Sequence, residues 1–171
     1  MIYIGIDPGK DGGISITFHD GEIKSWVMPV IGKVIDIQEL TKILDPCLGD
    51  AYCVLEDVHA IFGSSAGATF AFGYSLGLLE GILTAFMIPY SKIAPKKWQS
   101  QMFEGVKLQQ KPSSTGKTMK TDTKSMATIA AQRIFPNIDL RATDRCKKPH
   151  DGKVDSLLMM EYCRRNFNKT K

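Results

Sequence analysis

Two carboxylates in the first third of the chain come directly after apolar runs. Asp7 ends the run 2–6, and the proline and glycine that follow it cannot continue a central strand. Glu56 ends a second apolar run, 51–55, in the same way. A single acid at a strand end also suits an Asx-type turn or a loop cap. Two neighbouring central strands that each end in an acid would place both carboxylates side by side at one edge of a sheet.

A second pair of carboxylates, Asp151 and Asp155, lies near the end of the chain. Their spacing of four residues places them on one face of a helix and one turn apart, where like charges repel. Solvent-exposed acids at a helix N-terminus also fit the helix dipole, and a cation bound between them would remove the repulsion. The adjacent His150 could orient a water, transfer a proton or bind metal, or it could be a plain N-cap or turn residue.

The convergence of Asp7, Glu56, Asp151 and Asp155 is the arrangement that best accounts for all four acids. Carboxylate oxygens are the ligands that Mg²⁺ and Mn²⁺ prefer. Two such ions roughly 4 Å apart could activate a water and stabilise the leaving 3′ oxygen in phosphodiester cleavage. The acids therefore predict a site for two Mg²⁺ ions, with Mn²⁺ as a substitute.

The charges of the chain are divided unequally between its two halves. Residues 1–91 hold 4 Lys and Arg against 11 Asp and Glu, whereas residues 92–171 hold 18 against 7. A strongly basic half beside an acidic site indicates a surface for a polyanion, although a solvated basic face is the commoner reason for lysines alone. The candidates for phosphate contact are Lys96, Lys97, Lys107, Lys111, Lys117, Lys120, Lys147 and Lys148.

The elements that must position these residues follow from the hydrophobic pattern. Strands expected over 2–7, 14–18 and 23–28 form a meander, and a helix with an acidic cap follows over 36–44. The segment 64–86 reads as a glycine-rich helix that is apolar nearly all round, so it is buried or has two partners. We expect one α/β domain, with a strand over 90–94, helices starting at 95, 123 and 149, and a mobile basic loop over 104–123.

Bulk composition narrows the class of protein. A chain of 171 residues that is 43% hydrophobic can bury a core without disulfides. No run of about 18 apolar residues and no leader peptide is evident, which predicts a cytoplasmic protein without membrane contact. The four cysteines lack metal-ligand spacing, so free thiols are expected.

Five short motifs are spread over nearly the whole chain: Gly5-Ile6-Asp7-Pro8-Gly9, Leu55-Glu56-Asp57, Phe70-Ala71-Phe72-Gly73 with Gly77, Pro95-Lys96-Lys97-Trp98, and the run from His150-Asp151-Gly152 to Asp155-Ser156-Leu157-Leu158. Together they resemble the RuvC family of Holliday junction resolvases, and most closely the compact versions carried by bacteriophages. The first motif is shared with wider ribonuclease H-like and actin-like groups. Its pairing with the last two motifs is much more specific.

The resemblance implies a ribonuclease H-like fold, with a mixed five-stranded sheet flanked by helices, in a homodimer that nicks four-way DNA junctions with divalent metal. It places the four metal-binding acids of the family on Asp7, Glu56, Asp151 and Asp155. Many members stack an aromatic residue at the junction centre three positions after the glutamate. That position is His59 here, with Phe62 nearby. Phage-type members in general also cut other branched DNA.

Two other functions compete with a nuclease. One is a junction-binding architectural protein whose acids are structural. The other is an actin-like ATPase or kinase, which the opening motif alone suggests. The length argues against the latter, since such enzymes need two related lobes. For the homodimer, the glycine-rich helix over 68–86 is the candidate interface.

Overall fold

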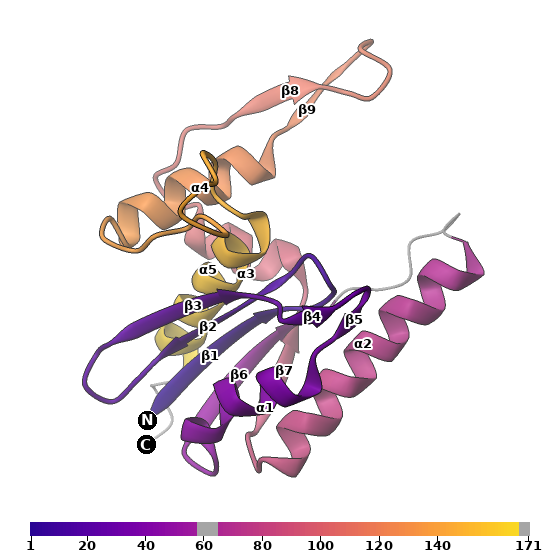
Figure 1. Cartoon of the computed structure of the whole chain (residues 1–171). Coiled ribbons are helices and arrows are strands. Elements are labelled where there is room, and N and C mark those ends of the chain that lie inside the picture. Colours follow the sequence, from indigo (N-terminus) through magenta and orange to yellow (C-terminus); the bar gives the residue numbers. More distant parts are fainter. Residues whose placement is uncertain (58–64, 168–171) are drawn as a thin grey trace.

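A computed structural model of the chain describes residues 1–57 and 65–167. Its centre is a five-stranded sheet in the order β3-β2-β1-β6-β7 (Figure 1). The first three strands form the expected antiparallel meander, and β6 and β7 run parallel to β1. Their bounds are β1 Ile2–Asp7, β2 Gly13–Thr17, β3 Ile23–Val27, β6 Ala51–Glu56 and β7 Tyr90–Ile93. The sheet is therefore mixed, as the sequence predicted.

Side chains of β1 alternate between two hydrophobic clusters, one on each face of the sheet. Ile2, Ile4 and Ile6 belong to the cluster on the side of α1 (Ile37–Leu44) and α2 (Ala66–Ala85). Tyr3 belongs to the opposite cluster, on the side of α3 (Pro95–Met102), α4 (Thr123–Ile134) and α5 (Asp151–Phe167). A strand that is buried on both faces explains why this run is almost wholly apolar.

Helix α5 packs directly on the backbone of β1 and β2, because glycines remove the side chains that would separate them. A side-chain carbon at Gly5 would collide with the Ser156 carbonyl oxygen, and one at Gly13 would collide with the backbone of Gly152. The hydroxyls of Ser15 and Ser156 lie 2.9 Å apart within this interface. This close approach brings the start of α5 to the end of β1.

Polar side chains cap the N-termini of three helices, and the acidic cap of α1 was expected from the sequence. The Asp36 side chain accepts hydrogen bonds from the backbone N–H groups of Gln38 and Glu39, which fixes the first turn of α1. Ser65 caps α2 through the N–H of Ala68, and Asp122 caps α4. A 3-10 turn, Asp45–Cys47, ends α1.

Two short hairpins lie outside the central sheet. The pair β4 (Val30–Ile31) and β5 (Val34–Ile35) was not expected from the sequence. The pair β8 (Gln110–Pro112) and β9 (Met119–Thr121) corrects the expectation of a basic loop over 104–123, because Gly116, at φ +70°, allows the chain to reverse and the strands to pair. This second hairpin projects away from the body of the molecule (Figure 1).

Candidate active site

The first two acids lie at the carboxyl edge of the central sheet. β1 and β6 are parallel neighbours, and their register pairs Ile6 with Leu55. Asp7 and Glu56, the next residues, therefore end adjacent strands at one edge, as the sequence predicted. Pro8 then turns the chain away, and Gly9 takes φ +107°, a conformation that favours glycine.

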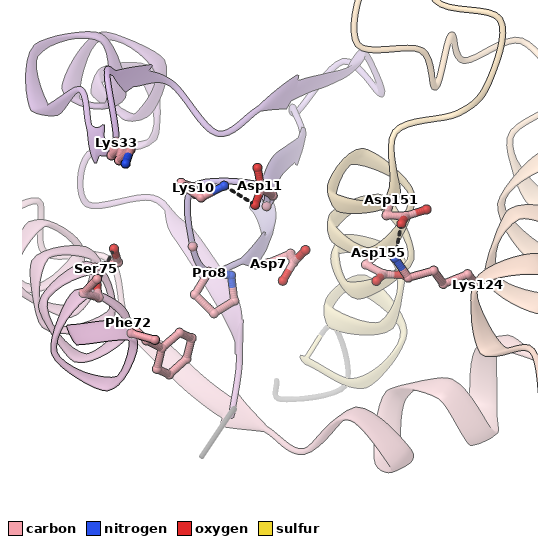
Figure 2. Close-up of a pocket in the computed structure, with 14 residues that line it drawn as sticks. Asp7, Pro8, Lys10, Asp11, Lys33, Phe72, Ser75, Lys124, Asp151 and Asp155 are labelled. Atoms are coloured by element: carbon pink, nitrogen blue, oxygen red, sulfur yellow. Dashed lines mark hydrogen bonds and ion pairs between the residues drawn. The ribbon is translucent and has the colours of Figure 1, made fainter. Parts of the chain in front are cut away.

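The last two acids reach the same edge from the first turns of α5. Asp7, Asp151 and Asp155 line one cavity of about 510 Å³. Figure 2 shows Asp151 and Asp155 on one side of this cavity, with Pro8 and Phe72 toward the other. The wall opposite α5 comes from α2, through Ala68, Ala71, Phe72 and Ser75. Three of the four predicted acids thus share an open cavity, between a sheet edge and two helices.

Glu56 stands slightly apart from the other three acids. It does not line the cavity, and its Oε1 accepts a hydrogen bond from the indole Nε1 of Trp98 at 3.0 Å. Trp98 is fully buried in α3, so this bond fixes the orientation of the carboxylate. The Pro95-Lys96-Lys97-Trp98 segment, one of the five motifs of the sequence, therefore serves to orient the Glu56 carboxylate.

The electrostatics of the acids are those of like charges crowded into a partly desolvated site. Burial, then Glu56, Asp155 and Asp151, raise the pKa of Asp7 well above its usual value. Burial, then Glu56 and Asp151, raise the pKa of Asp155 to about 7. Burial also raises the pKa of Glu56, against the hydrogen bond from Trp98. Such a cluster costs free energy while it is ionised and uncompensated.

Lys124 is a site residue that the sequence reasoning missed. Its Nζ forms an ion pair with Oδ2 of Asp151, across the space between α4 and α5 (Figure 2). Its charge lowers the pKa values of Asp7 and Asp155, against the larger effect of burial. One signal was present in the sequence. A lysine in the first turn of a helix opposes the helix dipole, so its position there suggests another role.

The donor set of the cavity fits a divalent cation, since carboxylates that repel one another are stabilised when positive charge lies between them. Within residues 1–57 and 65–167, no three His, Cys, Asp or Glu side chains are grouped so that they could hold a metal ion as they stand. Asp151 is paired with Lys124 and Glu56 with Trp98, so both contacts would have to change for these carboxylates to bind one.

The other predicted residues are placed as follows. The backbone N–H of His150 donates to the Leu140 carbonyl, and its ring Nδ1 is buried without a hydrogen-bond partner in the described part of the chain. Lys111 is half-buried and pairs with Asp122 at 2.7 Å. His59 and Phe62 lie outside the described residues. The remaining lysines are exposed: Lys96, Lys97, Lys107, Lys117, Lys120, Lys147 and Lys148.

The raised pKa values predict that the metal-free protein loses stability as pH rises. Asp7 and Asp155 bind protons more tightly in the folded chain than in the unfolded chain, where an Asp has a pKa of about 4. The free energy of unfolding should therefore fall from about pH 4 to about pH 7, the pKa of Asp155. In EDTA, we expect Tm to fall by roughly 5 °C or more between pH 5 and pH 8.

Scanning calorimetry with and without Mg²⁺ checks this. Asp155→Asn should flatten the pH dependence and raise Tm at pH 8, because it removes one of the crowded charges without changing the side-chain shape. Mg²⁺ should raise Tm of the unaltered protein at pH 8. A Tm in EDTA that rises over this range would contradict the assignment.

Comparison with known proteins addresses the fold. No protein-family model and no curated protein matches the sequence. The structure is similar to Thermus thermophilus RuvC in complex with Holliday junction substrate, with a TM-score of 0.56 and 14% identity over 97% of each chain. It is also similar to a second T. thermophilus RuvC structure, with a TM-score of 0.54 and 14% identity, covering 98% of this chain and 97% of that one. The chain therefore has a RuvC-like, ribonuclease H-like fold, as the sequence predicted.

Proposed function

We propose that this protein is a divalent-metal-dependent endonuclease that resolves Holliday junctions and cuts other branched DNA by paired phosphodiester hydrolysis. The observation that carries the proposal is the convergence of Asp7, Asp151 and Asp155 in one cavity, with Glu56 beside them, on a RuvC-like fold. The similar RuvC structure is a complex with Holliday junction substrate, which supports the same substrate class here. The sequence resemblance to phage-type members supports the wider range of branched DNA, cut in the cytoplasm of a host cell.

Each acid has a distinct position for this task. Asp7, between the sheet edge and α5, would hold the metal together with Glu56, Asp151 and Asp155, a set that would suit two Mg²⁺ or Mn²⁺ ions. When bound, these ions would supply Lewis-acid activation of water and stabilisation of the leaving oxygen. Trp98 holds the Glu56 carboxylate, and Lys124 adds positive charge where the scissile phosphate would enter. His150 precedes Asp151 but does not line the cavity, and the role proposed for it is to move a proton at this edge.

The basic half of the chain supplies the surface for the DNA backbone. Lys96 and Lys97 lie in the first turn of α3, next to the Trp98 that contacts Glu56. The β8–β9 hairpin carries Lys117 and Lys120, and no acidic residue occurs between Glu104 and Asp122. These exposed lysines, with Lys107, Lys147 and Lys148, are the phosphate contacts that we propose.

The homodimer that we propose would form through α2, one face of which is exposed and packs on no other element among residues 1–57 and 65–167. Leu79, Ile82 and Leu83 pack this helix onto the sheet. The opposite face is exposed and uncharged, with Phe70 and Tyr74 at 76% and 51% exposure. Gly73, Gly77 and Gly81 repeat at every fourth position there, and no atom of the described part of the chain lies within 4 Å of where their side chains would be. Such a face suits close contact with a second helix.

Helix α2 bears on the expectation of a protein without membrane contact. Ala66–Ala85 is long and apolar enough to cross a membrane by length and composition alone, so that expectation stays a prediction. Only 17% of its apolar window is buried within the chain. The exposed apolar face therefore has to be covered by something, and a second copy of the chain is the proposed partner.

Substitution of Gly77 distinguishes a dimer interface on α2 from a helix face that a monomer leaves uncovered. In a monomer, Gly77→Ala should stabilise α2 by ~1 kcal/mol, since alanine has the higher helix propensity and the space is open. In a dimer with close helix contact, Gly77→Ala should weaken association and Gly77→Leu should abolish it. Sedimentation equilibrium should give twice the 18.9 kDa of one chain for the unaltered protein. A concentration-independent 18.9 kDa would contradict the dimer, and co-flotation of that monomer with lipid vesicles would assign the face to a membrane.

The function itself is tested by cleavage of labelled four-way, three-way and flap DNA substrates in Mg²⁺ and in Mn²⁺. We expect symmetric paired nicks in the four-way junction, slower cleavage of the others and no cleavage in EDTA. Tight junction binding without cleavage in either metal would favour the alternative, a junction-binding architectural protein. Hydrolysis of ATP without DNA cleavage would favour the other alternative, an actin-like ATPase or kinase.

A further inference from the structure

The β4–β5 hairpin is a small element whose tip stands at the rim of the acid-lined cavity. Val30 pairs with Ile35 and Ile31 pairs with Val34, so Gly32 and Lys33 form the two-residue turn. Gly32 has φ +64°, which is the requirement of a II′ hairpin turn at its first central position. The buried Ile35 and the bond from the Asp36 N–H to the Pro29 carbonyl at 2.9 Å anchor its base. The core contact of Ile35 and this hydrogen bond therefore fix the position of the hairpin tip.

The tip exposes apolar side chains that have no role in the core. Val30, Ile31 and Val34 are 41%, 66% and 54% exposed. Large hydrophobic residues scattered singly over a surface are ordinary, but Ile31 and Val34 lie opposite each other on the two strands, so their side chains share one face and form a patch. Ile31 and Val34 pair across the hairpin and leave most of their apolar surface in water, so the patch they form suits a binding partner.

Lys33 connects this patch to the cavity of Asp7, Asp151 and Asp155. It lines that cavity together with Lys10 and Lys124. Figure 2 shows Lys33 across the cavity from Asp151 and Asp155. Lys10 is paired with Asp11, and Lys124 is paired with Asp151. Among the residues that the structure describes, Lys33 has no acidic partner, so it is the lysine of this cavity that is free to bind an anion.

We propose that the β4–β5 hairpin binds the DNA strand that enters the cavity, with Lys33 on a backbone phosphate beside the scissile one and Ile31 and Val34 against bases at the branch point. This inference rests on the proposed function. A backbone phosphate would form an ion pair with the unpaired Lys33. Unstacked bases would make apolar contact with the exposed β-branched side chains, as they do with other apolar wedges in DNA-binding proteins. The hairpin is thus a positioning element for the substrate strand.

Two variants test the two contacts separately. Lys33→Met keeps the length of the side chain and removes the charge. It should weaken junction binding roughly 10-fold at low salt and reduce the slope of log affinity against log salt by about 1. Ile31→Thr with Val34→Thr keeps the β-branched shape that strands favour, so the hairpin should still fold. Lys42→Met is the matched control, because Lys42 is an exposed lysine on α1 that pairs with Glu39.

The second readout is the fluorescence of 2-aminopurine placed at the branch point of a four-way junction, measured in Ca²⁺ so that it does not depend on cleavage. Binding of the unaltered protein should raise the fluorescence as the base unstacks, and the Thr double variant should lose most of this rise. If both variants bind and unstack the junction like the unaltered protein, the inference is wrong even where cleavage is normal. If the protein unstacks the branch point but cuts nothing in Mg²⁺, the nuclease proposal fails and the hairpin contact stands.

Discussion

Asp7→Asn should abolish cleavage of a synthetic four-way junction while leaving junction binding intact. The substitution keeps the size of the side chain and removes a carboxylate whose pKa is raised by burial and by the charges of Glu56, Asp155 and Asp151. A metal ligand within such a set cannot be replaced by its neighbours, so we expect the single-turnover rate in Mg²⁺ to fall roughly 10³-fold or more. Gel-based cleavage and electrophoretic mobility shifts measure the two properties.

The same variant should be more stable than the unaltered protein without metal. Removal of one charge relieves the repulsion from Glu56, Asp151 and Asp155, which raises the free energy of unfolding at pH 8. Loss of activity with a gain in Tm would separate a functional role from a structural one. Asp20→Asn is the control, since Asp20 accepts the N–H of Glu22 in a distant turn and asparagine can do the same. Unchanged cleavage by Asp7→Asn would remove Asp7 from the proposed site.

Local sequence signals predicted the parts of the site that depend on strand ends and helix periodicity. An apolar run that ends in an acid placed Asp7 and Glu56, because neighbouring parallel strands bring their ends to one edge. The spacing of Asp151 and Asp155 placed both on one helix. The close packing of α5 against the sheet could not be predicted from the sequence. It depends on contacts of Gly5 and Gly13 with a segment about 140 residues away.

The features of the fold and the site that were not predicted from the sequence were missed for separate reasons. The β4–β5 hairpin has strands of two residues each, too short for an alternating pattern to be visible. The β8–β9 hairpin carries polar residues on exposed strands, so it has the composition of a loop. Lys124 was missed because its role depends on a contact with Asp151, 27 residues later in the sequence and on another helix. The two hairpins thus lacked a recognisable local pattern, and only the contact of Lys124 depends on tertiary structure.

The role of Asp151 depends on how its pair with Lys124 responds to a cation. As the structure stands, the lysine supplies the positive charge that the carboxylate needs. If Asp151 held a divalent ion under the proposed function, the Lys124 ammonium would be free to approach the incoming phosphate. Lys124 would then stabilise charge on the scissile phosphate, in addition to holding Asp151 while the site is empty of substrate.

Lys124→Met should therefore reduce cleavage roughly 10²-fold with little change in junction affinity. Because Lys124 lowers the pKa values of Asp7 and Asp155, its loss should also move the acidic limb of the pH–rate profile to higher pH. Lys124→Arg should restore the limb and part of the rate, since the charge returns in a different shape. Lys24→Met, on an exposed lysine that pairs with Glu22, is the control. A rate loss with no shift of the acidic limb would mean that Lys124 only contacts DNA, and its pairing with Asp151 would then have no part in setting the charge of the site.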